Sequence, residues 1–283
     1  MKVAYLIVAH HNYDHLRRLL NVLKNDEVRI YVHIDAKVKM PDIDKEGVHF
    51  VTREDVYWGG FSQVKATLHL LKAAFADGAD YYILLSGVDF PVRSFSDLKK
   101  ELSNGYEFIN LFEGPTITKP ISRFDRYYFE LENRRSTGIK NKLVRGSEKL
   151  LHLFAKRSIP FKLYVGSNWF ALSRNAIGYI LKVIQEDKRY EKLFKWSLCP
   201  DEAFFQTILG NSPFKEKCRH NLTYADWSVP CPPAIITKEH IEKLKGKVED
   251  GYGVFESYFA RKFNDQSSEV VARIKMELLN NPV

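Results

Sequence analysis

The segment best suited to acid–base chemistry is an acidic pair that precedes an apolar run. Asp201 and Glu202 follow Pro200 and come before Ala203-Phe204-Phe205. Carboxylates after a proline favour a helix N-terminus, because they interact with unpaired backbone amides and with the positive end of the helix dipole. That structural interpretation is sufficient for Asp201. Glu202 is the candidate general base, since a carboxylate placed here can take the proton from an attacking hydroxyl group.

Two cations between aromatic residues form a second candidate site. Arg261 and Lys262 lie within the segment Tyr258-Phe259-Ala260-Arg261-Lys262-Phe263. When no metal is bound, a Lys or Arg from an ordered segment can stabilise a departing diphosphate group. The alternative is a surface turn whose aromatic side chains pack inward while the two cations stay in water.

A third candidate segment combines two aromatic residues with a glycine pair. Tyr57 and Trp58 precede Gly59-Gly60 at the start of a predicted helix. Glycines there admit a closely approaching ligand, and Tyr57 or Trp58 can stack on a base. A tight turn with two buried aromatic rings explains the pattern equally well. The segment lacks the G-x-G-x-x-G and Walker spacings, so dinucleotide and P-loop sites lose support.

The remaining polar motifs are a basic pair and the possible metal ligands. Arg123 and Arg126 are suited to phosphates or hydroxyl groups, although an ion-pair cluster explains their spacing as well. The sole D-x-D motif is Asp42-Ile43-Asp44, in a polar connection, and the segment after the predicted strand 81–85 offers only Asp89. The histidines show no zinc spacing. We therefore expect no metal and no other cofactor.

Alternating strands and helices explain how these residues come together. Apolar runs predict four strands, at residues 3–9, 28–34, 48–51 and 81–85. Helical periodicity follows the first strand and precedes the last, which indicates a mostly parallel sheet. Ligands of such sheets bind beyond the carboxyl ends of the strands, where His10, Asp35 and residues 86–89 fall.

The second half of the chain is less regular. Residues 112–160 are polar, basic and weakly periodic apart from a helix-like patch at 142–154, so we expect a long functional excursion. Regular structure then resumes with a predicted strand at 163–172 and predicted helices at 174–186, 201–209 and 267–279.

The composition narrows the partners and the compartment. The formal net charge of +8 favours anionic partners, but the basic residues are scattered, and clusters such as 134–135 and 140–145 are short, which disfavours nucleic acid. No apolar run is long enough to span a bilayer, and no signal peptide is recognised. Three cysteines without paired metal-ligand spacing, Cys199, Cys218 and Cys231, favour a reducing cytoplasm.

Six segments together carry a family resemblance, because they occur in family order across nearly the whole chain. They are residues 4–10, 32–35, 56–64, 86–91, 200–205 and 259–263. In this combination the chain resembles the core-2/I-branching β-1,6-N-acetylglucosaminyltransferase and xylosyltransferase family. The resemblance implies an α/β fold of the GT-A (Rossmann-like) type, with a mostly parallel central sheet and a long inserted excursion. It also implies a UDP-sugar donor and inversion at the anomeric carbon without a metal.

The resemblance also implies roles for individual residues. Glu202 matches the catalytic base, and Lys262, with Arg261 beside it, matches the lysine that binds the diphosphate. Further positions match the uridine site and the substrate site: Val8, Asp35 and Tyr57 for uridine, and Asp89, Arg123, Arg126 and Trp227 for the sugar or the acceptor. Lys238 is a candidate for a second phosphate-binding residue.

We expect a single domain over residues 1–283, with a nucleotide-binding half at 1–111, the variable excursion at 112–160 and an acceptor and catalytic half at 161–283. Animal members carry a membrane anchor, a stem and several disulfides, whereas this chain starts directly at its first strand. We therefore expect a bacterial cytoplasmic enzyme that contacts the inner face of the plasma membrane peripherally.

The expected reaction transfers a sugar, N-acetylglucosamine first and xylose second, from UDP to a glycan or lipid-linked glycan in surface polysaccharide synthesis. Two alternatives remain open. One is a metal-dependent transferase that uses Asp89, or Asp42 and Asp44. The other is a non-catalytic basic module that binds nucleic acid or anionic membrane through residues 134–135 and 140–145.

Overall fold

The computed structural model describes residues 1–131, 134, 137–230 and 232–279. Its centre is a seven-stranded sheet in the order β10-β6-β9-β4-β1-β2-β3. β9 is antiparallel to both of its neighbours, β4 and β6, and the other pairs of this sheet are parallel. The prediction of an α/β fold with a mostly parallel sheet is confirmed. The strands are β1 (Val3–Ala9), β2 (Val28–Ile34), β3 (Val48–Phe50), β4 (Tyr81–Ser86), β6 (Glu107–Ile109), β9 (Phe170–Ser173) and β10 (Cys218–Arg219).

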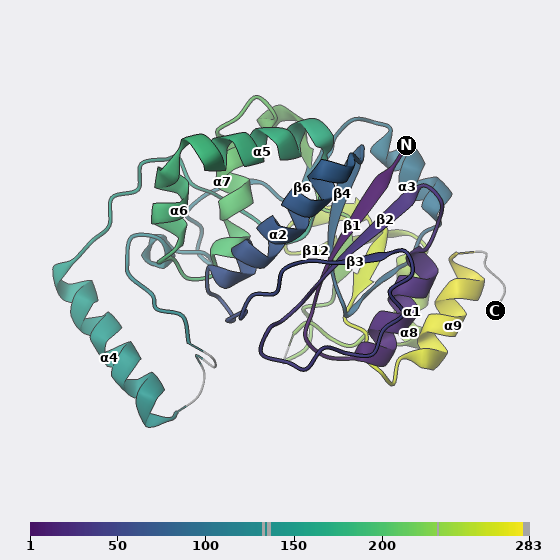
Figure 1. The fold of residues 1–283 in the computed structure, drawn as a ribbon, viewed down its shortest axis with the longest axis horizontal. Coiled ribbons are helices and arrows are strands. Elements are labelled where there is room, and N and C mark those ends of the chain that lie inside the picture. Colours follow the sequence, from purple (N-terminus) through teal and green to yellow (C-terminus); the bar gives the residue numbers. More distant parts are fainter. Residues whose placement is uncertain (132–133, 135–136, 231, 280–283) are drawn as a thin grey trace.

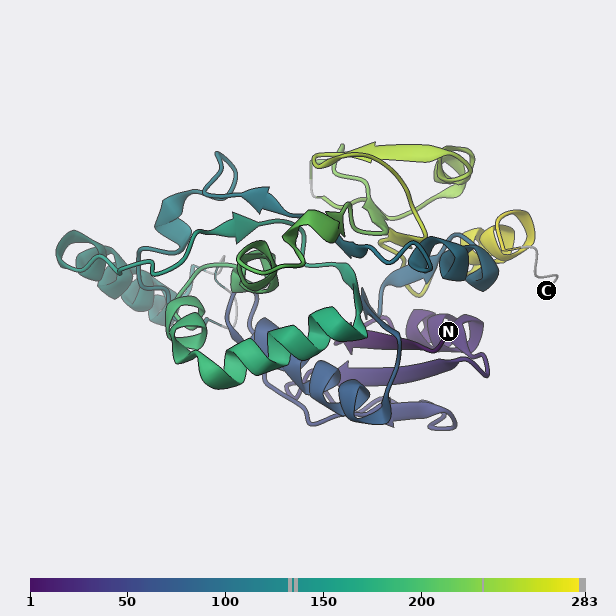
Figure 2. The same ribbon diagram turned by 90° about the horizontal axis from the view of Figure 1, so that it is seen from above.

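The two faces of the sheet pack against two separate hydrophobic cores. Side chains alternate between the faces along β1, so Tyr5 and Ile7 enter one core and Ala4 and Leu6 enter the other. Helices cover both faces (Figures 1 and 2). The first core takes residues from α1 (Tyr13–Leu23), α3 (Phe95–Leu102), α8 (Lys238–Leu244) and α9 (Ser268–Glu277). The second takes residues from α2 (Ser62–Asp77), α5 (Arg174–Glu186), α6 (Lys188–Phe194) and α7 (Phe204–Gly210).

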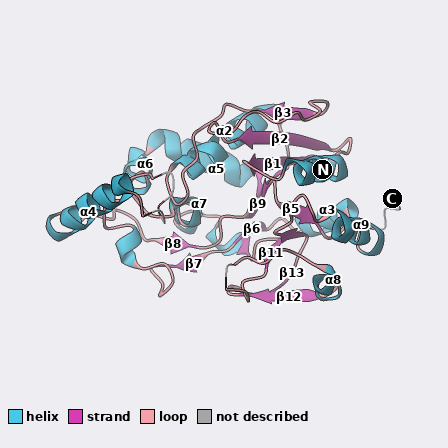
Figure 3. Cartoon of the chain, turned by 90° about the horizontal axis from the view of Figure 1, so that it is seen from below, coloured by secondary structure: helices cyan, strands magenta, loops and turns pink. Residues whose placement is uncertain are grey.

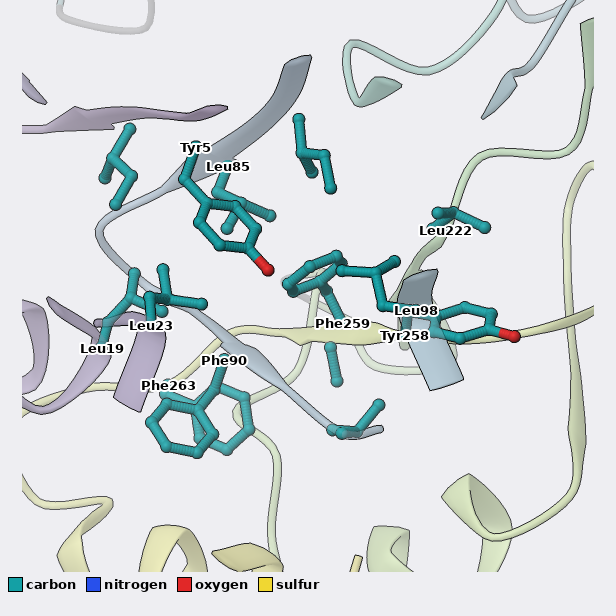
Figure 4. Close-up of a cluster of buried hydrophobic side chains, with 14 of the residues drawn as sticks. Tyr5, Leu19, Leu23, Leu85, Phe90, Leu98, Leu222, Tyr258, Phe259 and Phe263 are labelled. Carbon is teal, nitrogen blue, oxygen red and sulfur yellow. The ribbon is translucent and has the colours of Figure 1, made fainter. Parts of the chain in front are cut away.

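A second, three-stranded sheet brings the end of the chain to the edge where ligands are expected. Its central strand is β14 (Phe259–Arg261), which lies antiparallel to β5 (Asp89–Pro91) and parallel to β11 (Thr223–Ala225). Figure 3 labels the two outer strands, β5 and β11. Aromatic packing holds β14 in place (Figure 4). The rings of Tyr5 and Phe259 are 6.0 Å apart, and those of Phe90 and Phe263 are 5.7 Å apart.

The segment predicted as an excursion, residues 112–160, begins with β7 (Phe112–Glu113), which pairs with β8 (Tyr164–Val165) just beyond its end. It contains the short 3₁₀ turn η1 (Ile121–Arg123) and the helix α4 (Ile139–Phe154). The predicted helical patch is therefore confirmed and begins a little earlier than expected. In Figures 1 and 2, α4 projects away from the rest of the molecule. The remaining hairpin, β12 (Lys247–Asp250) and β13 (Gly253–Glu256), follows α8, and a 3₁₀ turn η3 (Lys215–Lys217) precedes β10.

Two predicted elements are each divided. The strand expected at 163–172 is wrong, because β8 and β9 join different sheets and are separated by a loop. Gly166 in this loop passes so close to the backbone of Asn110 that a Cβ would lie 1.9 Å from its carbonyl oxygen. The helix expected at 201–209 is also divided at Ala203, whose φ of −146° is not helical, into η2 (Pro200–Glu202) and α7.

Helices expected at 174–186 and 267–279 are confirmed as α5 and α9. Within the residues that the structure describes, no helix combines the length and apolar character needed to cross a bilayer.

Candidate active site

The predicted base lies on a tight turn that two distant segments hold in place. Cys199 adopts a left-handed conformation with φ of 51°, and its N–H donates to the carbonyl of Gly59 at 2.9 Å. Gly166 donates its N–H to the carbonyl of Glu202, also at 2.9 Å. The Glu202 side chain nevertheless keeps 32% of its surface exposed. The turn therefore fixes the backbone of Glu202 while its carboxylate remains open to solvent.

Two cations bind one oxygen of the Glu202 carboxylate. Lys119 Nζ lies 2.5 Å from Oε2, and an Nη atom of Arg123 lies 2.8 Å from the same oxygen. Across the described part of the chain, Oε1 has no hydrogen-bond partner. Charge-assisted bonds of this kind hold an orientation well. One oxygen is thus anchored, and the other is free to accept a proton.

Lys119 is itself firmly positioned, although sequence analysis did not select it. Its side chain is only 7% exposed, donates to the carbonyl of Gly166 at 2.8 Å and lies 5.9 Å from the ring centre of Tyr252. The only sequence signal is its place four residues before Arg123, which the η1 turn uses to bring both cations to Glu202. The dipeptide Lys119-Pro120 matches no motif that predicts a contact with a carboxylate.

Asp201 differs sharply from its neighbour. It is buried in the 3₁₀ turn η2 rather than at the start of a regular helix, and its Oδ1 has no hydrogen-bond partner within the described residues. Burial raises the pKa of Asp201, and the negative charge of Glu202 raises it further. Asp201 thus lies in the first turn of a short 3₁₀ helix that begins at Pro200, and not in the regular helix expected at 201–209.

A second cluster forms where β1 and β2 end. Val8 of β1 pairs with His33 of β2 and with Ser86 of β4. Asp35 is buried, and its Oδ1 accepts the N–H of Lys37 at 2.9 Å and that of Val56 at 3.4 Å.

Lys37 connects this cluster to the segment with the glycine pair. Its Nζ lies 3.5 Å from Asp35 Oδ2 and 4.5 Å from the ring centre of Tyr57. Three predicted uridine residues, Val8, Asp35 and Tyr57, thus lie on neighbouring backbone segments.

The two cations near the end of the chain differ in their surroundings. Arg261 faces Asp89 across the β14–β5 pair, with Nε 3.4 Å from Oδ1, and its guanidinium lies 4.1 Å from the ring centre of Trp169. Ser86 donates to Asp89 from its N–H at 2.8 Å and from Oγ at 2.6 Å. Asp89 is 0% exposed, so the prediction that it contacts substrate directly disagrees with the structure. It positions Arg261 instead.

Lys262 directly follows β14, the central strand of the three-stranded sheet, and is half-buried. Its N–H donates to Ala234, and its carbonyl accepts from Ile236. Burial lowers the pKa of Lys262, the Arg261 charge lowers it further, and Asp89 opposes both effects. Burial also lowers the pKa of His10, to which the Lys262 charge contributes in the same direction. Lys262 and His10 therefore share one electrostatic environment beyond the end of β1.

A single loop joins the two clusters. Gly166 contacts the Glu202 backbone, and three residues later Trp169 stacks on Arg261. Gln206 braces the loop by donating to the carbonyl of Ser167 at 2.6 Å. The carboxylate and the terminal cations thus flank one loop, although they come from different elements. Trp169 and Lys37 are further residues that motif analysis did not select as site residues.

Other predicted site residues lie farther from Glu202 or are engaged elsewhere. Arg126 lies beside Asp125, with its Nε 3.9 Å from Asp125 Oδ1. Trp227 follows β11 and is 58% exposed. Lys238 forms an ion pair with Glu269.

The proposed metal ligands of the alternative mechanism are also separated. Asp44 pairs with Lys24 at 3.1 Å on the surface, well away in sequence from the buried Asp89. The described residues hold no group of three or more His, Cys, Asp or Glu side chains arranged for a metal ion. Cys199 and Cys218 are free thiols, and Cys231 lies outside the described residues.

Comparison with known families places this site in context. The family model described as "Branch: Core-2/I-Branching enzyme" matches residues 3–246. The chain belongs to the Core-2/I-Branching enzyme family. The sequence-based recognition is confirmed, and with it the assignment to a family of enzymes.

Curated relatives of this Core-2/I-Branching family chain are named glycosyltransferases. The chain is 26% identical to "Xylosyltransferase 2" of Rattus norvegicus over 81% of its own length and 27% of the relative. It is 27% identical to the "Beta-1,3-galactosyl-O-glycosyl-glycoprotein beta-1,6-N-acetylglucosaminyltransferase" of Homo sapiens over 73% of its length and 48% of the relative. It is 25% identical to "Xylosyltransferase oxt" of Drosophila melanogaster over 94% of its length and 32% of the relative. The chain therefore spans between about a quarter and a half of the relatives it matches.

Proposed function

We propose that this chain is an inverting glycosyltransferase of the GT-A type that transfers N-acetylglucosamine from UDP to a hydroxyl group of a glycan. The observation that carries the proposal is the state of Glu202, whose Oε2 is held by Lys119 and Arg123 while its side chain stays 32% exposed and Oε1 has no partner among the described residues. A fixed and open carboxylate is what a general base requires. Family membership favours this enzyme over the non-catalytic basic module.

In the proposed reaction the acceptor oxygen attacks the anomeric carbon from the face opposite UDP. A new carbon–oxygen bond forms as the bond to the UDP oxygen breaks, and the hydroxyl proton passes to Glu202 Oε1. The electron pair leaves with the diphosphate, whose growing negative charge needs a fixed cation. Lys262 is the proposed direct ligand. Arg261, which contacts Asp89 and Trp169, helps to position Lys262 and adds to the positive potential around the diphosphate.

We further propose that the donor binds without a divalent metal. The carboxylate nearest the end of β4 is Asp89, and its oxygens already face Ser86 and Arg261. Arg261 thus occupies the position beside Asp89 that a bound metal ion would take. The uridine would lie against Val8, Asp35 and Tyr57.

Arg123 and Trp227 would contact the sugar or the acceptor. Arg126 is proposed in the same role from its position three residues after Arg123.

The donor sugar has a second candidate, xylose, because two of the three relatives named above are xylosyltransferases. We propose a glycan or lipid-linked glycan acceptor in bacterial surface polysaccharide synthesis, acted on from the cytoplasmic side.

The test begins with thermal unfolding in the presence of UDP, UDP-N-acetylglucosamine, UDP-xylose and GDP, each with and without EDTA. A ligand that binds only the folded state raises the melting temperature. Stabilisation by the UDP compounds that persists in EDTA supports the proposal and ranks the two donors. Stabilisation that EDTA abolishes and manganese restores would favour the metal-dependent alternative.

The second step compares Glu202→Gln with Glu186→Gln, an exposed glutamate on α5 that serves as the control. We expect Glu202→Gln to keep the UDP-induced stabilisation but to lose turnover by about 100-fold or more, the scale of a missing general base. Glu186→Gln should change neither quantity. Near-normal turnover of Glu202→Gln would refute its role as the base.

A further inference from the structure

The helix α4 is amphipathic, but its apolar side chains are exposed and its acidic side chain is buried, which is the opposite of an ordinary surface helix. Its polar face lies against the segment that leads into it, at Tyr127, Phe129 and Arg134, and its apolar face lies toward solvent. The inward face is anchored by Glu148, which is buried, accepts the N–H of Phe129 at 2.8 Å and pairs with Arg134. His152 adds a hydrogen bond to the carbonyl of Tyr127 at 2.8 Å. The orientation of the helix is therefore fixed by polar contacts.

The outward face is apolar and carries large side chains on both sides of Gly146. At 100° per residue its large side chains fall within an arc of roughly 100° along the whole helix. Each of them is at least 60% exposed, which is unusual for a cluster of this size on a soluble surface. They are Ile139, Leu143, Leu150, Leu153 and Phe154.

Lysines border this apolar face, and no exposed acid accompanies them. Lys140 flanks it on one side and Lys142 and Lys149 on the other, all exposed. The single acidic residue of α4 is Glu148, which faces inward. Arg134 and Arg145, which belong to the basic clusters seen in the sequence, contribute inward contacts instead, since Arg145 donates to the Arg134 carbonyl at 3.2 Å. The outward surface is thus apolar in the middle and cationic at its margins.

We propose that the outward face of α4 docks onto an anionic lipid surface. The apolar side chains enter the boundary between headgroups and acyl chains, and the flanking lysines extend to the anionic headgroups. A second copy of the chain fits this face less well, because symmetric pairing would bring lysines of like charge together on a chain whose net charge is already +8.

The position of α4 suits this role. It projects from one end of the molecule in both ribbon views (Figures 1 and 2). The segment that leads into it contains Arg123, one of the two cations on Glu202, and Tyr128 N–H donates to the Trp196 carbonyl at 2.9 Å to tie that segment to the body. A docked α4 would therefore hold the candidate active site close to the membrane surface.

The test measures binding to vesicles of phosphatidylcholine alone and of phosphatidylcholine mixed with phosphatidylglycerol, by co-sedimentation without donor or acceptor. We expect binding to the anionic vesicles only. The triple variant Leu150→Ser/Leu153→Ser/Phe154→Ser should lower that affinity by at least about tenfold. A matched control, Val254→Ser/Met276→Ser, removes exposed apolar side chains elsewhere and should bind as the unmodified protein does.

Lysine variants test the electrostatic part. Lys142→Gln and Lys149→Gln should each weaken binding by about fivefold, and Lys182→Gln on α5 should not. The UDP-induced rise in melting temperature should be the same in all variants, which separates this inference from the proposed function. Equal binding of the triple variant and the unmodified protein would overturn the inference, as would absence of binding to anionic vesicles at low salt. A dimer that the triple substitution abolishes would instead assign the face to a second copy.

Discussion

The ion pair between Asp89 and Arg261 allows a quantitative prediction. Asp89→Asn keeps the size of the side chain and one oxygen for the Ser86 donors, but it removes the charge that faces Arg261 at 3.4 Å. Arg261 then remains against Trp169 as a largely buried cation without a counter-charge. The structure therefore predicts a loss of stability rather than a neutral change.

The size of the loss follows from burial. Breaking a buried pair by removing one partner costs about 3–5 kcal/mol. Burial raises the pKa of Asp89, so part of the pair's attraction is already offset by desolvation, and we expect the lower end, about 3 kcal/mol. At roughly 2–4 °C per kcal/mol for a chain of this order of size, the melting temperature should fall by about 6–12 °C.

The assay is thermal unfolding at neutral pH, with Asp44→Asn as the matched control. Asp44 pairs with Lys24 at 3.1 Å, but its side chain is mostly exposed, so its loss should cost less than about 1 kcal/mol. The double variant Asp89→Asn/Arg261→Gln should be more stable than the two single losses predict, because it leaves no unpaired charge. Two results would refute this account. One is an equal melting temperature for Asp89→Asn and Asp44→Asn, and the other is a double variant whose loss of stability equals the sum of the two single losses.

Two further predictions concern single residues. Lys119→Met should lower kcat by about tenfold or more and should change the affinity for UDP little. The reason is that Glu202 loses one of the two hydrogen bonds to its Oε2 and the Gly166 carbonyl loses the Lys119 donor. A loss of UDP affinity as large as the loss of kcat, measured in a binding assay, would contradict this role. His15 is buried, and desolvation lowers its pKa from 6.5 to about 4, so its contribution to stability is present above about pH 6.5 and is lost as the pH falls toward 4. His15→Phe should flatten the melting temperature over that range, whereas His49→Phe, an exposed control, should leave the slope unchanged.

Much of the sheet could be predicted because local patterns decide it. The apolar run at 81–85 has no polar alternation, which is typical of a strand buried on both faces, and it forms β4 between β1 and β9. The amphipathic stretch at 174–186 forms α5 with the same bounds. In both cases tertiary packing agrees with local preference.

The divided elements show where local patterns fail. Residues 163–172 are apolar enough for one strand, but the close approach of Gly166 to Asn110 separates β8 from β9. Periodicity reports which side chains are apolar, and it carries no information about a neighbouring backbone from another part of the chain. The break at Ala203 arises similarly, because the turn before it is held by Gly59 and Gly166.

The candidate site was accessible mainly through family resemblance. The residue types alone make Glu202 and Lys262 candidates beside a structural alternative, and the match of whole segments in order gives each of them a specific role. Lys119 was missed since its contact with Glu202 joins segments far apart in sequence, and nothing in its local segment marks it. The burial of Asp89 against Arg261 could not be predicted locally, because it depends on β14, a strand that comes late in the chain.

That late strand has a consequence for how the protein is made. β14 is the central strand of the small sheet, so during synthesis β5 waits with an unpaired edge until residues 259–261 have emerged. Until then the growing chain has neither terminal cation and no cover over Phe90. A chain that stopped before residue 259 would therefore expose a strand edge suited to aggregation and would lack the groups proposed to hold the diphosphate.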